Sequence, residues 1–121
     1  MKAIIEIAKR GNALRETLEL ARRVDAGERL PEADYRLAYE SARTLFSDLT
    51  PARLELLDTL RRTGPCSVYA LAKTAGRNYS NVHSDVAALE ALGLIARDDQ
   101  GAVSVPFDAI EIRLGLSAAA A

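Results

Sequence analysis

A run of polar side chains between residues 73 and 84 has the composition of a surface that contacts DNA. The side chains of Asn81 and His83 can donate hydrogen bonds to base edges or accept them. Hydroxyl and cationic side chains around them suit phosphate oxygens. The complete set of candidate DNA contacts is Lys73, Arg77, Asn78, Tyr79, Ser80, Asn81, His83, Ser84 and Arg97.

The same residue inventory argues against catalysis. The chain has one His and one Cys, so the usual zinc ligand sets cannot be built, and no glycine-rich phosphate loop is present. We therefore expect a protein that is not an enzyme and that needs no cofactor or metal. A single cysteine also excludes an intramolecular disulfide, which fits a cytoplasmic location.

The charge balance limits how DNA would be bound. The formal net charge is −1 and the pI is about 5.8, whereas strong non-specific DNA binders carry a basic surplus. Binding would therefore depend on a local, salt-sensitive patch, for which Arg61, Arg62, Lys73 and Arg77 are candidates. Taken one at a time, each of these is more often an ordinary surface charge.

Capping signals predict three helices followed by a hairpin in residues 50–106. Thr50 precedes a proline at the first helical position, Ser67 and Asn78 are N-cap residues, and Gly76 is a C-cap glycine. Apolar stripes at helical spacing face a core, and two short strands, 94–97 and 102–105, flank a turn. This order predicts a winged helix-turn-helix. The stripes are Leu54, Leu57 and Leu60; Val68, Leu71 and Ala72; and Val82, Val86 and Leu89.

The flanking segments predict further strands. Residues 2–8 alternate weakly as a strand, and a helix then runs to Asp25 with Gly27 as its C-cap. Residues 35–49 fit either a strand or a helix, and we favour a short strand followed by a helix capped by Ser41. Residues 110–116 form the cleanest alternation, before a disordered end.

The expected fold class is therefore α+β: a winged helix-turn-helix with an N-terminal strand-helix extension and a C-terminal strand. The expected organisation is an N-terminal dimerisation or partner-binding segment (1–49), the DNA-binding domain (50–106), and a C-terminal strand with its tail (107–121). No stretch approaches the ~20 apolar residues that a membrane span needs.

Four segments resemble a family of small MarR-like transcriptional regulators of bacteria and archaea, which includes the TumA-type antitoxins. They are LTPARLELL at 49–57, GPCSV at 64–68, LAK at 71–73 and the run from Gly76 to Ile95, with VPFDAI at 105–110 matching the family's ending. The resemblance implies an antitoxin and autorepressor that binds its own promoter as double-stranded DNA. It also implies a cognate toxin as partner, which we place on residues 1–47, and palindromic sites call for a homodimer.

The chain departs from that family at Ser80 and Ser84, where its members usually carry basic residues. Each lost phosphate contact weakens DNA binding and lowers its salt dependence. Two alternatives therefore stay open. One is a protein-interaction module on a winged-helix scaffold, and the other is a stand-alone repressor that responds to a ligand near Tyr35, Tyr39 and Phe46.

Overall fold

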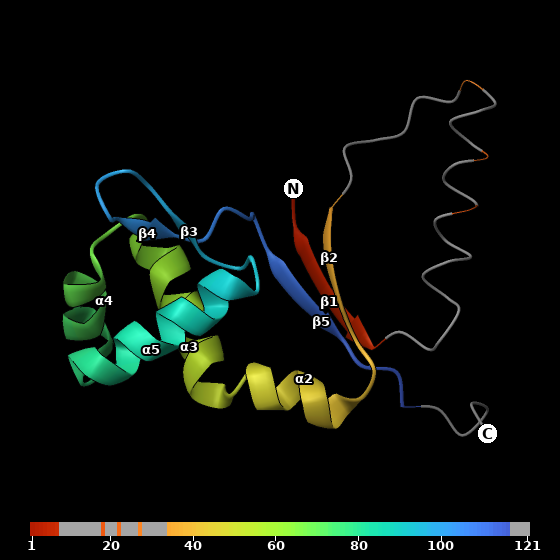
Figure 1. The fold of residues 1–121 in the computed structure, drawn as a ribbon, viewed down its shortest axis with the longest axis horizontal. Helices are drawn as coiled ribbons and strands as arrows, with labels where there is room; N and C mark the ends of the chain where they lie inside the picture. The colour runs from red at the N-terminus through yellow and green to blue at the C-terminus, as the bar shows by residue number, and fades with distance from the viewer. Residues whose placement is uncertain (8–17, 19–21, 23–26, 28–33, 117–121) are drawn as a thin grey trace. The chain divides into compact units, whose positions relative to one another are not determined.

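A computed structural model describes residues 1–7, 18, 22, 27 and 34–116. The described chain is α+β (Figure 1). Its contacts divide it into two compact units, one made of Met1–Leu45 with Phe107–Ala121 and the other of Phe46–Pro106. The C-terminal strand thus shares a unit with the N-terminal strands. The part of the chain described contains no helix long and apolar enough to cross a membrane.

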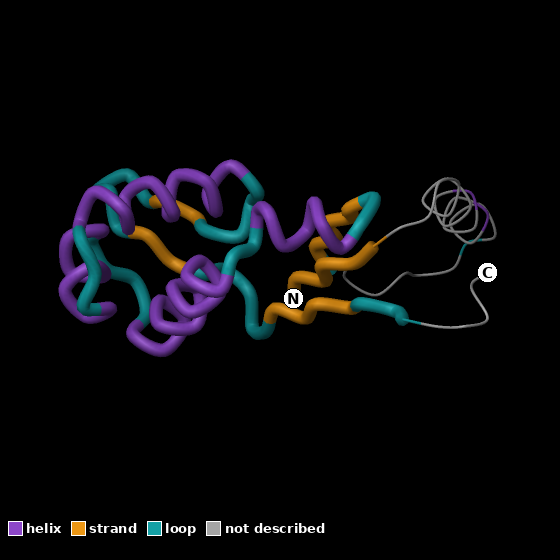
Figure 2. The backbone as a smooth tube through the Cα atoms, turned by 90° about the horizontal axis from the view of Figure 1, so that it is seen from below, coloured by secondary structure: helices purple, strands orange, loops and turns teal. Residues whose placement is uncertain are grey.

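The first unit contains a three-stranded parallel sheet in the order β2-β1-β5 (Figure 2). The central strand is β1 (Ala3–Ile7), and its neighbours are β2 (Tyr35–Tyr39) and β5 (Ile110–Arg113). The register places Ala3 opposite both Tyr35 and Ile110. Central strands of parallel sheets are buried on both faces, which explains why Ala3, Ile4 and Ile5 are all buried.

The expected C-terminal strand is confirmed but is shorter than predicted. Pairing with β1 ends at Glu6 and Arg113, so Leu114 and Leu116 continue the alternation beyond the last residue paired with β1. The choice of a strand followed by a helix in residues 35–49 is also confirmed. The helix is α2 (Ala42–Asp48), and Ser41 Oγ accepts a hydrogen bond from the Thr44 amide at 3.2 Å.

Two expectations fall largely outside the described residues. The helix predicted to run to Asp25 is one, and the disordered end after Leu116 is the other. Gly27 is described and has a positive φ of 81°, as expected of a glycine that follows a helix.

In the second unit, the three predicted helices form with the predicted caps. They are α3 (Pro51–Thr63), α4 (Val68–Ala75) and α5 (Tyr79–Ala91). Thr50, Ser67 and Asn78 each accept a hydrogen bond from a backbone amide in the first turn. Gly76 closes α4 in the left-handed conformation at φ 66°, which favours glycine. The turn between α4 and α5 is therefore as short as predicted.

The apolar stripes of these helices form the core of the unit. Each predicted residue of α4 and α5 is buried, and so are Leu57 and Leu60 of α3. Leu54 is only half-buried, and Leu56, which was not predicted, takes a core position instead. The core face of α3 is thus formed by Leu56, Leu57 and Leu60 and not by Leu54, Leu57 and Leu60 as predicted.

A short hairpin completes the unit. Its strands β3 (Ala96–Arg97) and β4 (Val103–Ser104) are antiparallel and shorter than predicted. Leu94 and Ile95, which were predicted to begin the first strand, are buried but lie before β3. Cys66, in the α3–α4 connection, adds a bridge to Val103 through backbone hydrogen bonds of 3.1 and 2.8 Å. The order of helices, turn and hairpin is compatible with a winged-helix fold (Figure 1).

Candidate nucleic-acid interface

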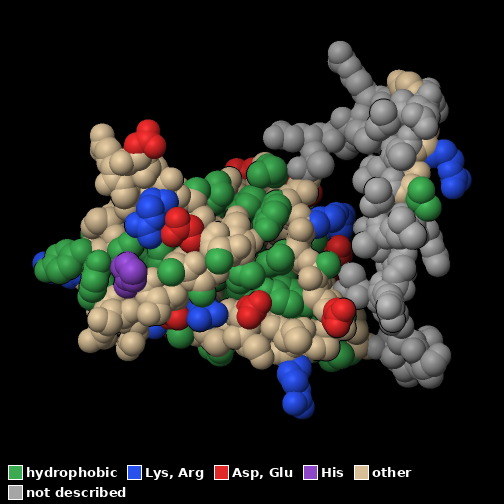
Figure 3. Space-filling view, viewed as in Figure 1, with side chains coloured by type: hydrophobic (Ala, Val, Ile, Leu, Met, Phe, Trp, Pro, Cys, Tyr) green, Lys and Arg blue, Asp and Glu red, His purple; other side chains and the backbone are tan. Residues whose placement is uncertain are grey.

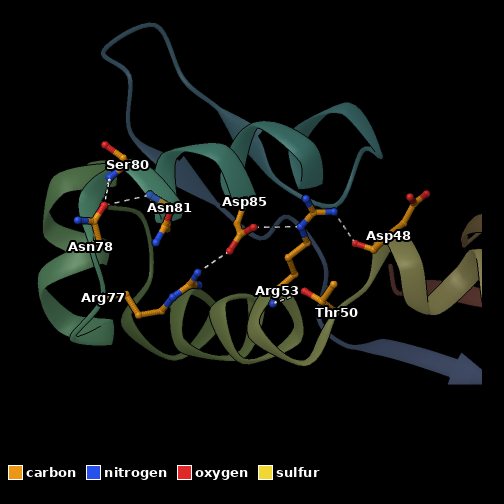
Figure 4. Close-up of polar contacts among 8 residues, drawn as sticks. All are labelled: Asp48, Thr50, Arg53, Arg77, Asn78, Ser80, Asn81 and Asp85. Atoms are coloured by element: carbon orange, nitrogen blue, oxygen red, sulfur yellow. Dashed lines mark hydrogen bonds and ion pairs between the residues drawn. The ribbon is translucent and has the colours of Figure 1, made fainter.

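The first turn of α5 is fixed by its cap. Asn78 Oδ1 accepts hydrogen bonds from the amides of Ser80 and Asn81, at 2.9 and 3.3 Å (Figure 4). These bonds satisfy amides that would otherwise lack a partner at a helix start. Among the candidate contacts, Asn78 therefore has a structural role, because its side chain sets the direction in which α5 begins.

One face of α5 is exposed and polar. Ser80, Asn81, His83 and Ser84, which we call the recognition face, are all exposed, whereas Val82 between them is buried. No hydrogen bond or ion pair to another described residue engages the side chains of Ser80, Asn81 or Ser84. Their donors and acceptors are therefore available to a molecule that approaches this face.

Two tyrosine rings adjoin the recognition face. The ring of Tyr79 lies 5.8 Å from that of His83 and 6.5 Å from that of Tyr69 in α4. Tyr69 is 67% exposed and Tyr79 is 49% exposed, and the space-filling view shows the histidine at the surface (Figure 3). Sequence reasoning missed Tyr69, although it lies one residue outside the apolar stripe of α4 and so had to point away from the core.

Arg77 is engaged inside the unit. Its Nη2 donates to Asp85 Oδ2 at 2.7 Å, and Arg53 Nε donates to the other carboxylate oxygen at 3.1 Å (Figure 4). Arg53 also donates to the backbone carbonyl of Asp48 at 2.8 Å. This cluster, Arg53–Asp85–Arg77, ties the start of α3 and the α4–α5 turn to the middle of α5. Arg77 is thus a residue that positions α5.

The other candidate cations differ from each other. Lys73 is exposed on α4. Arg97 donates to both carboxylate oxygens of Glu90, with the shortest distance 3.0 Å, and this hydrogen bonding raises the pKa of Arg97. The pair connects β3 to the end of α5. In the hairpin turn, Asp98 Oδ1 accepts from the amides of Gln100 and Ala102, both at 2.9 Å, so this acid stabilises the turn.

A model of the HVO_A0114 family matches residues 48–112, which is more than half of the 121 residues. The chain belongs to the HVO_A0114 family. No curated protein and no solved structure matches it. The family segment begins at Asp48, whose carbonyl anchors Arg53, and it contains the whole Arg53–Asp85–Arg77 cluster and the recognition face. The HVO_A0114 match therefore includes both the candidate interface and the ion pairs that position it.

The pKa of Asp85 is lowered in the folded HVO_A0114 segment. Burial by itself raises this pKa, but the hydrogen bonds and charges of Arg77 and Arg53 outweigh burial and hold it below its usual range. A depressed carboxyl pKa contributes stability above the unfolded-state pKa, and this contribution is lost as the pH falls through the folded-state value.

We therefore expect the stability difference between the wild type and Asp85→Asn to depend on pH. It should be largest near pH 7 and shrink progressively below about pH 5, where the unfolded carboxyl begins to take up a proton. Amide hydrogen exchange at Val86 and Leu89 in α5, compared between the two proteins at each pH from 7 to 3, measures the difference, and subtraction removes the effects of the other acids. A difference that stays constant down to pH 3 would contradict the role of Asp85 as an ionised partner.

Proposed function

We propose that this chain is a non-enzymatic, sequence-specific DNA-binding transcriptional regulator. In this proposal α3, α4, α5 and the β3–β4 hairpin form a winged helix-turn-helix, with α5 as the recognition helix in the major groove. The short turn at Gly76 and the hairpin that follows α5 support the assignment. Fold alone does not fix function, so the proposal rests on the recognition face.

The observation that carries the proposal is the contrast between the acidic side chains of α5 and its small polar ones. Asp85 and Glu90 are engaged by arginines, while Asn81 and Ser84 have no partner among the described residues. Ala87 and Ala91 are exposed on the same helix, so it presents small side chains that permit a close approach to base edges. A merely solvated helix surface commonly carries long charged side chains, and this surface has none at these positions.

The proposal gives each candidate residue a role. Asn81 and His83 contact bases, and Tyr79 with the two serines of the recognition face contacts phosphate. Lys73 supplies a phosphate-binding charge. Asn78, Arg77 and Arg97 act indirectly, because their side chains cap α5 or hold it in place.

The proposed regulator acts in the cytoplasm on its own promoter. An antitoxin role with a toxin partner remains a prediction of the MarR-like resemblance. It is tested separately, by asking whether a toxin encoded beside this gene co-purifies with the full chain. The outcome of that experiment leaves the DNA-binding proposal unaffected.

We expect Asn81→Ala to lower sequence preference. Loss of a side-chain contact to a base edge should reduce discrimination between the promoter site and a scrambled duplex by about tenfold, within the ~1–3 kcal/mol of a good base contact. Fluorescence anisotropy with both duplexes at fixed salt measures the ratio. Ala52→Ser, a small change at an exposed position on α3 outside the recognition face, serves as the control and should keep most of the preference.

The experiment has a clear negative outcome. If the wild type binds neither duplex at 50 mM salt, the DNA-binding proposal is wrong. If it binds both equally and Asn81→Ala changes nothing, binding is non-specific and the recognition face has no role in it.

The second candidate is a protein-interaction module on the same scaffold. It is favoured because Arg77 and Arg97 are paired with acids. Of the three cationic candidate contacts, Lys73 alone has no ion pair within the described residues. This candidate predicts that the wild type does not bind DNA and that an Asn81→Ala variant still binds its protein partner. The anisotropy experiment above therefore separates the two candidates.

A further inference from the structure

Strand β5 is an edge strand with one side occupied. It pairs with β1, and no strand in the described part of the chain pairs with its other side (Figure 2). An open edge exposes backbone donors and acceptors that can pair with another chain, so proteins usually cover or block it.

The register shows which backbone groups face the open side. The Ala3 amide donates to the Ala109 carbonyl at 3.0 Å, and the ladder continues in parallel register. Alternate residues of a strand bond to the same neighbour, so Glu111 and Arg113 direct their backbone groups to β1. The N–H and C=O groups of Ile110 and Ile112 therefore point to the open side.

The apolar pattern of this strand also extends further than the sheet does. Leu114 and Leu116 continue the alternation of Ile110 and Ile112, yet they lie beyond the last residue paired with β1. Leu116 is 86% exposed, and both leucines are large hydrophobic side chains at the surface. A strand from a partner on the open side of β5 could pair with this part of the chain.

We propose that β5 pairs antiparallel with β5 of a second copy of this chain, with Ile112 opposite Ile112 across a two-fold axis. In this register Ile110 lies opposite Leu114, and Glu111 lies opposite Arg113. From Ile110 to Leu114 every cross-strand pair is then apolar with apolar or acid with base, combinations that stabilise sheets. The central pair is formed by residues whose backbone groups point to the open side, so it is a hydrogen-bonded pair.

Neighbouring registers lack this complementarity. A two-fold axis at Glu111 places two acids opposite each other, and an axis at Arg113 places two arginines opposite each other. Like charges directly opposite are destabilising. A slip by one residue puts charged side chains opposite apolar ones. The side chains of β5 are thus complementary to themselves in one antiparallel register, and this charge complementarity identifies a second copy as the occupant.

The proposal does not depend on DNA binding, and its test is the oligomeric state of the full chain. The wild type should be a dimer by sedimentation equilibrium at micromolar concentration. Ile112→Pro removes an amide that points to the open side and leaves the ladder to β1 intact. It should raise the dimer dissociation constant at least about tenfold, whereas Ile112→Val, which keeps the amide, should stay close to the wild type.

A charge exchange tests the register itself. Glu111→Arg should raise the dissociation constant about tenfold, because arginines then face each other twice across the axis. Adding Arg113→Glu to that variant should restore dimerisation, since opposite charges face each other again. Within one copy Glu111 contacts Lys2 at 2.9 Å and Arg113 at 3.1 Å. Lys2→Ala controls for loss of the first ion pair and should leave the dimer unchanged. Glu111→Gln removes both internal pairs without placing arginines opposite each other, so it should weaken the dimer less than Glu111→Arg does.

Several results would overturn the proposal. A monomeric wild type at 100 µM would exclude the dimer as a stable species, and a dimeric Ile112→Pro variant with a wild-type constant would place the interface elsewhere. Circular dichroism shows whether each variant is folded. If Ile112→Pro does not fold, the charge series still decides. A double exchange as weak as Glu111→Arg would exclude this register, because it would show that the opposing charges do not meet.

Discussion

Asp85→Ala should destabilise the second unit by about 2–3 kcal/mol, whether or not DNA is present. The carboxylate is 16% exposed and accepts hydrogen bonds from Arg77 and Arg53. Removing it leaves two partly buried guanidinium groups close together without the charge between them. A buried ion cluster adds little folding stability compared with apolar residues in the same place. Removing one partner from it is nevertheless costly, because the remaining buried charges are left without compensation.

This effect has to be measured on the unit that contains the cluster. The chain has two compact units, and a global unfolding signal combines them. Amide hydrogen exchange at the buried residues Val86 and Leu89 reports on α5 directly. We expect their protection to fall by about 30–140-fold in Asp85→Ala, the equivalent of about 2–3 kcal/mol at 1.4 kcal/mol per factor of ten.

Asp58→Ala provides the matched control. Asp58 forms an ion pair with Arg62 one turn away on α3, at 3.3 Å, but its side chain is 70% exposed. Exposed pairs of this kind contribute less than about 0.5 kcal/mol. If the two substitutions reduce protection equally, the Arg53–Asp85–Arg77 cluster has no special role in holding α5.

Local signals made most of the second unit predictable. Thr50, Ser67 and Asn78 act through amides two or three residues away, so their side-chain types alone indicate where helices begin. Helical spacing also located Val82 and Val86 in the core. It failed at Leu54, because three leucines in α3 lie within one turn of each other and the packing of α4 and α5 decides which of them are buried.

Features that depend on distant pairing were not predictable. The alternation in residues 110–116 indicated a strand, but only its pairing with β1, more than a hundred residues earlier, sets the end at Arg113. The bridge from Cys66 to Val103 lies outside any apolar pattern. No sequence pattern distinguishes a strand that has a partner along its whole length from one that does not.

The candidate site was predicted by residue type and corrected by geometry. Asn81 and Ser84 are exposed as expected, yet Arg77 and Arg97 are paired with acids eight and seven residues away along the chain. Those separations exceed the three or four residues at which helical side chains meet. Arg77 lies in the turn that precedes α5, and a turn after α5 separates Glu90 from Arg97. A basic residue near a recognition helix is therefore weak evidence for a phosphate contact.

Ser80→Arg with Ser84→Arg should strengthen DNA binding about a hundredfold at 0.1 M salt. Both serines lie on the recognition face and are exposed, so arginines fit there without disturbing the core. Each new phosphate contact steepens the dependence of log K on log salt by about 0.9, which corresponds to nearly tenfold in affinity at 0.1 M. Two contacts should therefore change the slope by about 1.8.

The salt slope distinguishes a contact from a general effect of charge. The control variant Ala52→Arg with Glu55→Gln raises the net charge by the same two units at exposed positions on α3. It should change affinity less than the recognition-face variant and leave the slope close to the wild type, because its charges do not replace counterions at the groove. Anisotropy titrations from 50 to 300 mM salt give both slopes. Equal slopes for the two variants would mean that the start of α5 does not approach the DNA backbone, which would favour the protein-interaction module over the DNA-binding regulator.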